Sequence, residues 1–243
     1  MKTVLVTGAT SGIGEACVLK FSREGYRIIG LGRDTKRLEK VRLSALSNGA
    51  QDCRMHAVDL LNLDEIHSFF KNMVAIEKID ALINSAGIAY TEKAEDITID
   101  QWDEVIRVNL TAPFFVIQAA LPLLSKSSNP SIVNVSSIAG RTRSLSLGCH
   151  YSTSKAAIIG MTRHLAAELG PKGIRLNCTA PSQTHSPMLD SALSKDGQVS
   201  LAKTVPLGRL STPNDQAEVI YFLCTPPAYY INGAIIDVNG GLV

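Results

Sequence analysis

Tyr151 and Lys155 stand four residues apart in a segment whose pattern predicts a helix from Tyr151 to about Gly170. Residues at i and i+4 share one face of a helix and lie about 6 Å apart along its axis. A lysine ammonium beside a phenol favours the phenolate, so we expect Lys155 to lower the pKa of Tyr151, which is about 10 in isolation. The pair would then exchange a proton near neutral pH. By itself this spacing is a weak indication, because it occurs by chance in many helices.

Two further polar residues stand where such a pair would need them. Ser137 follows the apolar run Ile132–Val135, at the carboxyl edge where parallel α/β sheets bind ligands. Asn109 lies in a long helical pattern between Val108 and Leu110. Taken alone, each would be interpreted as a helix cap or as a buried amide bonded to backbone. Only their combination with the tyrosine and the lysine favours a catalytic site.

A glycine-rich turn with the sequence TGATSGIG (Thr7–Gly14) joins the apolar run Val4–Val6 to a helical pattern. Glycine can adopt the positive φ of a tight turn and lets a ligand approach the backbone closely. The N-terminus of the following helix offers unpaired N–H groups and a positive dipole end to a pyrophosphate. In this strand–turn–helix context, the spacing G-x-x-x-G-x-G predicts a dinucleotide-binding turn.

The end of the second expected strand indicates which dinucleotide is bound. An acidic residue in this region commonly binds a free ribose 2′-hydroxyl, but Gly32 stands there and Arg33 follows it. A guanidinium without a carboxylate suits a 2′-phosphate, which arginine can bind bidentately. We expect Asp34 to be the N-cap of the next helix, with its side chain facing backbone N–H groups. These residues together predict NADP(H).

Composition and charge narrow the class of protein. With 243 residues and 45% hydrophobic content, the chain is long enough for one large α/β domain with a buried core. A net charge of +2 argues against a general nucleic-acid binder, and we find no run of about 18 apolar residues that would span a membrane. Five scattered cysteines without a C-x-x-C pair indicate reduced thiols. We therefore expect a cytoplasmic protein without a metal site.

Short β-rich runs alternate with helical patterns along the whole chain, which predicts a parallel sheet with helices on both faces. The expected strands are Val4–Val6, Arg27–Leu31, Met55–Val58, Ala81–Ile83, Ile132–Val135, Arg175–Thr179 and Ile235–Val238. The helices between them are expected to begin near Gly12, Asp34, Asn62, Thr98, Tyr151 and Thr212. We therefore predict an α/β fold, a single doubly wound Rossmann domain with a seven-stranded parallel sheet over residues 1–243. An irregular substrate flap is expected at about 181–206.

In order and over nearly the whole length, these motifs resemble those of the short-chain dehydrogenase/reductase family. Asn109, Ser137, Tyr151 and Lys155 fall on the family's catalytic tetrad. The resemblance implies that Tyr151 exchanges the proton with the substrate oxygen and that Ser137 polarises the carbonyl. It also implies that Lys155 holds the nicotinamide ribose, that Asn109 anchors a water relay and that Asp59 meets the adenine.

Two positions depart from the family pattern. Ser85 replaces the second asparagine of the N-N-A-G motif, and Ser182 replaces the glycine that follows Pro181 after the sixth strand. Because Ser182 has a Cβ where the chain passes the nicotinamide, we expect the local geometry to differ. The cofactor-binding residues that the resemblance implies are Gly8, Ser11, Gly12, Ile13, Gly14, Arg33, Asp59, Leu60, Asn84, Ala86, Gly87, Tyr151, Lys155, Pro181, Thr184 and Ser186.

Within the family, the segments VPLGRL (Val205–Leu210) and DVNGG (Asp237–Gly241) resemble 3-oxoacyl-[acyl-carrier-protein] reductases. This implies NADP(H)-dependent reduction of a 3-oxoacyl thioester or another ketone to a secondary alcohol, or the reverse oxidation. Lys172 occupies one position where carrier-protein readers present basic residues. Arg141 and Arg143 could meet an acidic group of the substrate or could belong to a solvated loop. The alternative function is a non-catalytic NADP-binding regulator or scaffold, which the loss of a tetrad residue would favour.

The two helical segments 100–124 and 151–169 carry more apolar residues than one buried face needs. Examples are Phe114, Phe115, Ile117, Ile158, Ile159 and Met161. Family members pair these helices across a dimer axis and use the last strand in building tetramers. The resemblance therefore implies a homotetramer that acts on a small-molecule carbonyl or alcohol and binds neither nucleic acid nor a membrane.

Overall fold

Seven apolar runs form the strands of one parallel sheet, as the sequence predicts. The computed structural model describes residues 1–73, 76–144 and 146–243. The strand order is β3-β2-β1-β4-β5-β6-β7, and every neighbouring pair is parallel. The strands are β1 (Thr3–Thr7), β2 (Arg27–Gly32), β3 (Asp52–Ala57), β4 (Ala81–Asn84), β5 (Ser131–Val135), β6 (Arg175–Pro181) and β7 (Ile235–Val238). The predicted doubly wound Rossmann fold is therefore confirmed.

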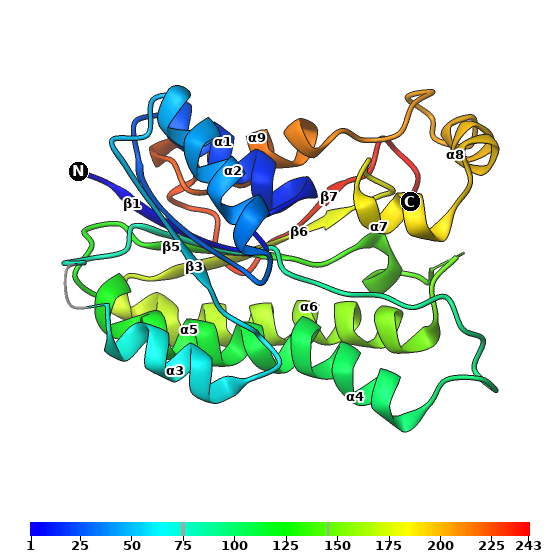
Figure 1. Ribbon diagram of the computed structural model, residues 1–243, viewed down its shortest axis with the longest axis horizontal. Coiled ribbons are helices and arrows are strands. Elements are labelled where there is room, and N and C mark those ends of the chain that lie inside the picture. Colours follow the sequence, from blue (N-terminus) through cyan, green and yellow to red (C-terminus); the bar gives the residue numbers. More distant parts are fainter. Residues whose placement is uncertain (74–75, 145) are drawn as a thin grey trace.

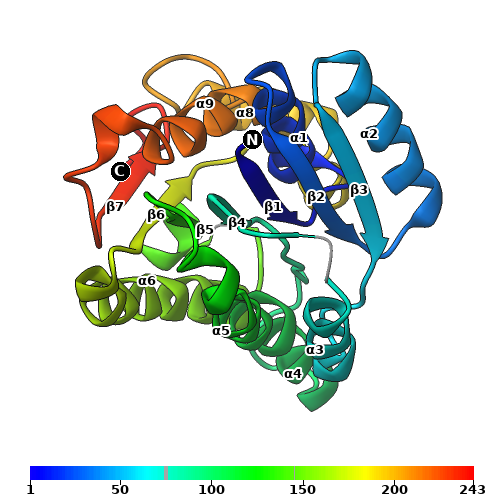
Figure 2. The ribbon, with the colours of Figure 1, turned by 90° about the vertical axis from the view of Figure 1, so that its left-hand side faces the viewer.

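Helices cover both faces of this sheet and give the layers seen in Figures 1 and 2. They are α1 (Gly12–Arg23), α2 (Thr35–Ser47), α3 (Leu63–Lys71), α4 (Ile99–Ile106), α5 (Ala112–Leu124), α6 (Cys149–Leu169), α7 (Pro187–Ala192), α8 (Lys195–Ala202) and α9 (Pro213–Leu223). One face carries α1, α2 and α9, and the other carries α3, α4, α5 and α6. The short helices α7 and α8 lie beyond one end of the sheet.

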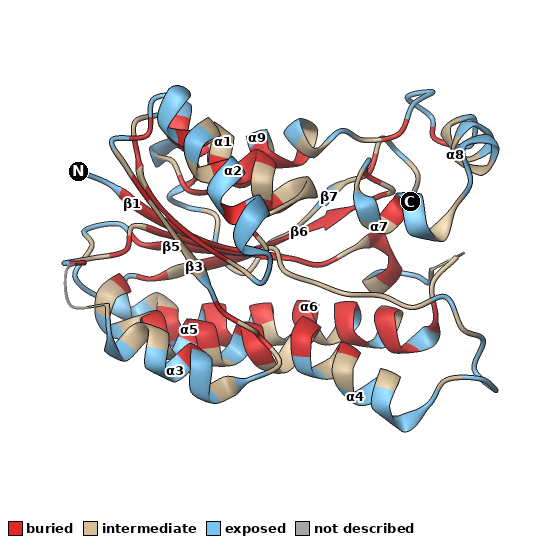
Figure 3. Ribbon diagram, viewed as in Figure 1, coloured by how far each residue is buried: buried red, intermediate tan, exposed pale blue. Residues whose placement is uncertain are grey.

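Successive residues of β1 belong to two separate cores, because neighbouring side chains on a strand point to opposite faces. Val4 and Val6 pack in a cluster that includes residues of α1 and α9, whereas Leu5 packs in a cluster that includes residues of α5 and α6. All residues of β1 are buried, and Figure 3 shows burial throughout the central strands. Burial on both faces explains why the strands read as continuous apolar runs.

The long helix expected over residues 100–124 is interrupted between α4 and α5. A turn of π-helix, η1 (Arg107–Thr111), separates the two and contains Asn109. By length and composition alone, the segment Ile99–Leu124 would be long and apolar enough to cross a membrane, contrary to the expectation that no such run exists. One such helix is a weak indication, and the inner face of α5 belongs to the core beneath the sheet. We therefore interpret this segment as a core helix.

The predicted flap is more regular than its sequence suggested, because it contains α7 and α8. Each short helix has a serine N-cap: Ser186 accepts a backbone N–H at the start of α7, and Ser194 does the same for α8. Pro187 occupies the first turn of α7, where its missing N–H costs nothing. These local signals are present in the sequence, but helices of this length carry too little apolar periodicity to be recognised.

The order of the strands reverses at β1, because β2 and β3 lie on one side of it and β4 to β7 lie on the other. In doubly wound folds, the crevice outside the carboxyl ends of the strands at such a switch point binds ligands. The chain leaves these strand ends through the glycine turn before α1, the start of α2 and the loop after β4. The turn after β5 and the start of α6 lie along the same edge. The fold thus brings the glycine turn, the end of β2, the loop after β4 and the Ser137 and Tyr151 segments to one edge of the sheet.

Candidate active site

The glycine turn after β1 packs directly on the loop after β4. Thr7 Oγ1 accepts the backbone N–H groups of Ser85 and Ala86 at 3.2 and 3.3 Å. Gly8 has a φ of 67°, and a Cβ there would lie 2.8 Å from the Cα of Ala86. A Cβ on Gly14 would lie 2.1 Å from the carbonyl oxygen of Gly8. Both positions therefore require glycine.

A cleft of about 470 Å³ lies along these strand ends. One end of the cleft is lined by the glycine turn, the end of β2 and the residues that follow β3. The other end is lined by the turn after β5, by the start of α6 and by α7. Ser11, the N-cap of α1, lines the cleft and makes no side-chain cap bond. The first N–H groups of α1 are thus available at the cleft, which suits a pyrophosphate. The glycine cradle and this uncapped helix fit a dinucleotide.

Arg33, Asp34 and Arg37 line one end of the cleft, and Arg37 Nε lies 3.4 Å from Asp34 Oδ2. Arg33 is exposed and lines the cleft directly after Gly32. Asp34 confirms its expected role as an N-cap: its Oδ1 accepts two backbone N–H groups of α2 at 3.0 Å each. A Cβ on Gly32 would lie 2.7 Å from Cγ2 of Thr10. An acidic residue therefore does not fit at Gly32 unless Thr10 moves.

The turn after β5 packs tightly on α6 and so places Ser137 beside Tyr151. Ser136 Oγ donates to the carbonyl oxygen of Lys155 at 2.7 Å. A Cβ on Gly140 would lie 2.5 Å from the carbonyl carbon of Lys155. Ser137 precedes a 3₁₀ turn, η2 (Ile138–Gly140), and its Oγ accepts a backbone N–H of that turn at 3.1 Å. The Ser137 hydroxyl accepts this bond and so keeps a proton that it can donate to Tyr151 or to a ligand.

Tyr151 and Lys155 lie on one face of α6, as expected, and both are buried. Lys155 Nζ lies 5.7 Å from the centre of the Tyr151 ring and donates to the carbonyl oxygen of Val135 at 2.9 Å. Burial lowers the pKa of Lys155 to about 8. Burial also raises the pKa of Tyr151, and the Ser137 hydroxyl partly opposes that rise. Our expectation that Lys155 lowers the Tyr151 pKa is therefore wrong for this structure, because loss of water around the phenol dominates.

Asn109 connects the loop after β4 to α6. Its Oδ1 accepts the N–H of Ile88 at 2.8 Å, and its Nδ2 donates to the Ile88 carbonyl oxygen at 2.9 Å and to Ser154 Oγ at 3.1 Å. Ser154 Oγ in turn donates to the carbonyl oxygen of Tyr151 at 2.8 Å. Asn109 thus positions Ile88, which lines the cleft, next to the helix that carries Tyr151. The water relay that the resemblance implies stays a prediction.

Most of the sequence-predicted site residues line the cleft. They are Gly8, Ser11, Gly12, Ile13, Arg33, Asp59, Leu60, Ala86, Gly87, Ser137, Tyr151, Lys155, Pro181, Thr184 and Ser186. Gly14, Asn84 and Asn109 do not belong to its lining. The Asn84 side chain instead bonds a neighbouring strand: its Nδ2 donates to Oδ1 of Asn134, the paired residue on β5, at 2.9 Å. The sequence around a strand-end asparagine does not indicate whether its side chain faces the cleft or bonds a neighbouring strand.

The end of the cleft beyond Tyr151 has walls that sequence reasoning missed. They come from the loop after β4, the segment before α6, the loop after β6 and α7, and they include Ile88, Leu147, Gln183, Met188, Leu189 and Ala192. Only the serine–proline start of α7 hinted that the flap would present an ordered apolar face here.

Comparison with known proteins decides the family. A family model described as enoyl-(acyl carrier protein) reductase matches residues 8–243. The chain is similar to the 3-oxoacyl-[acyl-carrier-protein] reductase of Aquifex aeolicus, with 35% identity over 242 residues, which cover 99% of this chain and 97% of the relative. The chain belongs to the short-chain dehydrogenase/reductase family.

Solved structures with bound cofactors resemble this short-chain dehydrogenase/reductase closely. A 3-ketoacyl-(acyl-carrier-protein) reductase from Brucella melitensis complexed with NADH has a TM-score of 0.90 and 28% identity, covering 99% of this chain and 98% of that chain. A putative NAD(P)-dependent gluconate 5-dehydrogenase from Beutenbergia cavernae, with bound NADP at low occupancy, has a TM-score of 0.93 and 28% identity. The match covers 99% of this chain and 96% of that chain. The protein is therefore an oxidoreductase that acts on carbonyl or alcohol groups, and the non-catalytic alternative is not favoured.

The reductase accommodates Ser182 without backbone strain. Among the described residues, no residue other than glycine has a positive φ, so Ser182 does not need the conformational freedom of the family's glycine. Its N–H donates to the carbonyl oxygen of Val238 at 3.3 Å, which continues the pairing of β6 with β7. A serine therefore fits the course of the chain here.

The substitution Lys155→Met tests the cost of burying the ammonium. The folded-state pKa of about 8 lies below the ordinary value of 10.5, so between these pH values the unfolded chain binds more protons than the folded chain. Folding stability therefore rises with pH through this window, and below about pH 8 the full cost remains. We expect the unfolding free energy of wild type, minus that of Lys155→Met, to rise by on the order of 3 kcal/mol from pH 8 to 10.5.

Denaturant titrations of both proteins at a series of pH values measure this difference. Tyrosine and cysteine side chains that titrate in the same range are common to both proteins, so their contributions cancel. Parallel stability curves across the window would mean that Lys155 titrates as an ordinary exposed lysine.

Proposed function

We propose that this reductase uses NADP(H) to reduce a ketone to a secondary alcohol, with Tyr151 as the proton donor, in one catalytic domain that spans residues 1–243. A single observation carries the proposal. The Tyr151 phenol, the Ser137 hydroxyl and the Lys155 ammonium gather at one end of the cleft, and cationic side chains line its other end.

Three side chains of this protein have separate functions in the proposed reduction. Bound NADPH supplies the hydride that adds to the carbonyl carbon. Tyr151 gives its proton to the carbonyl oxygen, and Ser137 donates a hydrogen bond to the same oxygen as charge develops there. A raised Tyr151 pKa keeps the phenol protonated before the reaction. Lys155, with a pKa of about 8, stays mainly protonated at neutral pH and would hold the ribose.

The choice of NADP(H) over NAD(H) rests on Arg33. Its guanidinium lines the cleft, and Asp34, which would repel a 2′-phosphate, is engaged with the N-terminus of α2. Arg37 lines the same end of the cleft. The two solved relatives carry NADH in one case and NADP in the other, so the family alone does not select the cofactor. At the other end, Thr184 and Ser186 would hold the nicotinamide carboxamide.

A 3-oxoacyl thioester is the first substrate to test, because relatives of this chain are named for that activity. Lys172, the basic residue expected to meet an acidic carrier protein, is exposed on the short turn before β6. This turn lies at the amino end of β6, on the edge of the sheet opposite the cleft, so within one chain Lys172 is not at the mouth of the cleft. The Ile88–Leu147–Leu189 wall would accept an apolar acyl chain.

We propose a homotetramer in the cytoplasm, with α4, α5 and α6 forming one interface. Ile99, Trp102 and Phe114 stay exposed on α4 and α5, at 80, 38 and 37%. Three residues that suggested this interface from the sequence are instead buried in the chain's own core: Ile117, Ile158 and Ile159. The proposal therefore depends on the exposed aromatic residues and on β7, which forms an edge of the sheet. The cysteines, all free, fit a reducing compartment.

Replacing Tyr151 with Phe removes the proton donor but keeps the ring. We expect kcat for acetoacetyl-CoA to fall by at least about 100-fold, while the Kd for NADPH, measured by fluorescence titration, stays close to wild type. Tyr230→Phe is the control, since that side chain is fully exposed. If Tyr151→Phe keeps normal turnover, another group donates the proton.

Replacing Arg33 with Leu should weaken NADPH binding by about 10- to 100-fold and leave NADH binding almost unchanged. One charged hydrogen bond contributes roughly 1.5–3 kcal/mol, and 1.4 kcal/mol is a factor of ten. Titration of both reduced cofactors measures this, with Arg42→Leu as the control because Arg42 pairs with Glu39 on α2. Added salt should reduce NADPH affinity more than NADH affinity. Equal wild-type affinities for the two cofactors would contradict the assignment.

Sedimentation at micromolar concentration should give a tetramer for the wild type. Phe114→Glu places a charge on the proposed interface and should produce smaller species. Leu43→Glu, on α2 at a position 55% exposed, is the matched control and should leave the mass unchanged. A monomeric wild type would refute the proposed assembly.

A further inference from the structure

The two arginines between η2 and α6 take different directions. Arg141 donates to Asp237 Oδ2 at 2.9 Å and lies in a separate surface hollow with Arg163. Arg143, two residues later, lines the catalytic cleft. The sequence left both open as partners for an acidic substrate group. Only Arg143 is placed where a bound substrate would meet it.

Short tethers fix the backbone around Arg143 relative to the catalytic groups. On one side, the N–H and the Oγ1 of Thr142 both donate to the carbonyl oxygen of Ile138, the residue after Ser137, at 2.9 and 3.2 Å. On the other side, the N–H of Ser144 donates to Oγ of Ser152, the residue after Tyr151, at 3.1 Å. Arg143 is thus held between the two segments that present the carbonyl-binding hydroxyls.

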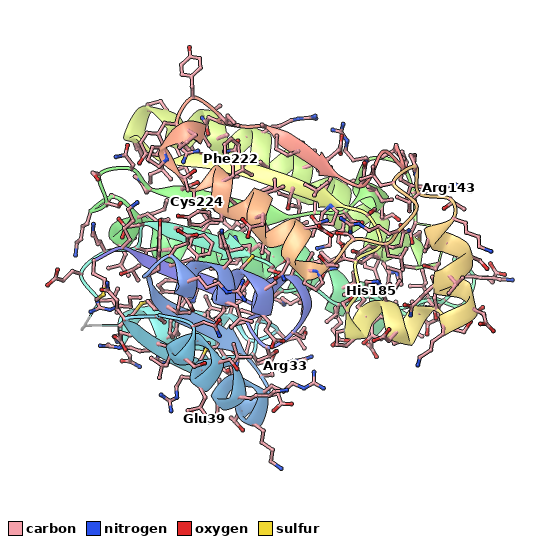
Figure 4. All side chains as sticks on the ribbon, turned by 90° about the horizontal axis from the view of Figure 1, so that it is seen from above. Arg33, Glu39, Arg143, His185, Phe222 and Cys224 are labelled. Carbon is pink, nitrogen blue, oxygen red and sulfur yellow. The ribbon has the colours of Figure 1, made fainter. Side chains whose placement is uncertain are left out.

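Charge in the cleft is distributed unequally. Its dinucleotide end carries both signs, with Arg33, Arg37, Asp34 and Asp59 in the lining. At the catalytic end, the charged members of the described lining are Lys155 and Arg143, and no carboxylate is among them. Figure 4 labels Arg33 and Arg143 and shows them well separated, with His185 between them in this view.

Of the two cations at the catalytic end, Arg143 is the one available to a substrate. Lys155 is buried, and its Nζ donates to the Val135 carbonyl oxygen. Arg143 is exposed at the cleft, and within the described ranges no carboxylate lies within 4.0 Å of its guanidinium. An uncompensated guanidinium in a cleft concentrates anions and binds a carboxylate through two parallel hydrogen bonds.

We propose that the natural substrate is a ketone that carries a carboxylate, which Arg143 binds while the ketone oxygen lies between Tyr151 and Ser137. This inference rests on the proposed function and specifies its substrate class. The rest of the substrate lies against the apolar wall formed by Ile88, Leu147, Met188, Leu189 and Ala192. That wall accepts a hydrocarbon body, so Arg143 supplies the charge recognition.

Matched acids and esters test this proposal. kcat/KM with NADPH is measured for acetoacetate and 4-oxopentanoate and for their methyl esters, which keep the ketone and remove the charge. We expect wild type to favour each acid over its ester by about 10- to 100-fold, as one charge-assisted contact provides. Arg143→Gln should abolish this preference by lowering the values for the acids far more than those for the esters. Arg141→Gln, with its side chain outside the cleft, should keep it.

A binding measurement removes the dependence on turnover. Calorimetric titration of the NADPH complex with 3-hydroxybutyrate and with its methyl ester, alcohols that cannot react with the reduced cofactor, should show about 10-fold or greater preference for the acid in wild type. That preference should be lost in Arg143→Gln and retained in Arg141→Gln. Rising salt should weaken binding of the acid and leave binding of the ester unchanged.

The other outcomes overturn the proposal in distinguishable ways. If the esters are turned over as efficiently as the acids, the proposed binding of a substrate carboxylate is refuted, but the proposed reductase function is not. Equal losses for acid and ester in Arg143→Gln would assign the arginine a structural role. A loss confined to acetoacetyl-CoA would show that Arg143 binds phosphates of a carrier group. Absence of NADPH oxidation with esters, acids and thioesters alike would refute the proposed function itself.

Discussion

Close backbone packing at the switch point between β1 and β4 is the constraint on which the cleft depends. Gly8 lies against Ala86 and Gly14 lies against Gly8, each nearer than a side chain would allow. The Thr7 hydroxyl joins the two strand ends through two hydrogen bonds. Overpacking a core by even small groups costs about 1–3 kcal/mol. A Cβ at Gly8 or Gly14 would also move the first turn of α1 away from the cleft that it lines.

The catalytic end of the cleft repeats this arrangement with different residues. Gly140 lets the turn after β5 rest on the backbone of α6, and the Ser136 hydroxyl bonds the Lys155 carbonyl oxygen. The side chains of Tyr151 and Lys155 are consequently buried. A group out of water exerts a stronger field on its neighbours but is costly to charge. The lowered pKa of Lys155 and the raised pKa of Tyr151 are two results of the same burial.

Asn109 connects the loop after β4 to α6, and it lies where the helix is irregular. It lies in the π turn between α4 and α5, and its amide bonds both Ile88 and Ser154. Because Ser154 Oγ also bonds the Tyr151 carbonyl oxygen, the loop after β4 and the helix that carries Tyr151 are held in one network. A buried polar network of this kind fixes geometry when its members are satisfied. The family's asparagine thus has a positioning role visible in this chain.

The sequence by itself determined the alternation of strands and helices along the chain, the glycine turn and the helix cap at Asp34. These features are local: glycine spacing, apolar runs and capping residues act within a few positions of one another. Only the tertiary structure decided that Asn84 bonds Asn134, that Arg143 lines the cleft while Arg141 pairs with Asp237, and that burial raises the pKa of Tyr151. Each of these features depends on distant segments of the chain, which exclude water from a side chain or supply its bonding partner. A local sequence pattern cannot predict which segments these are.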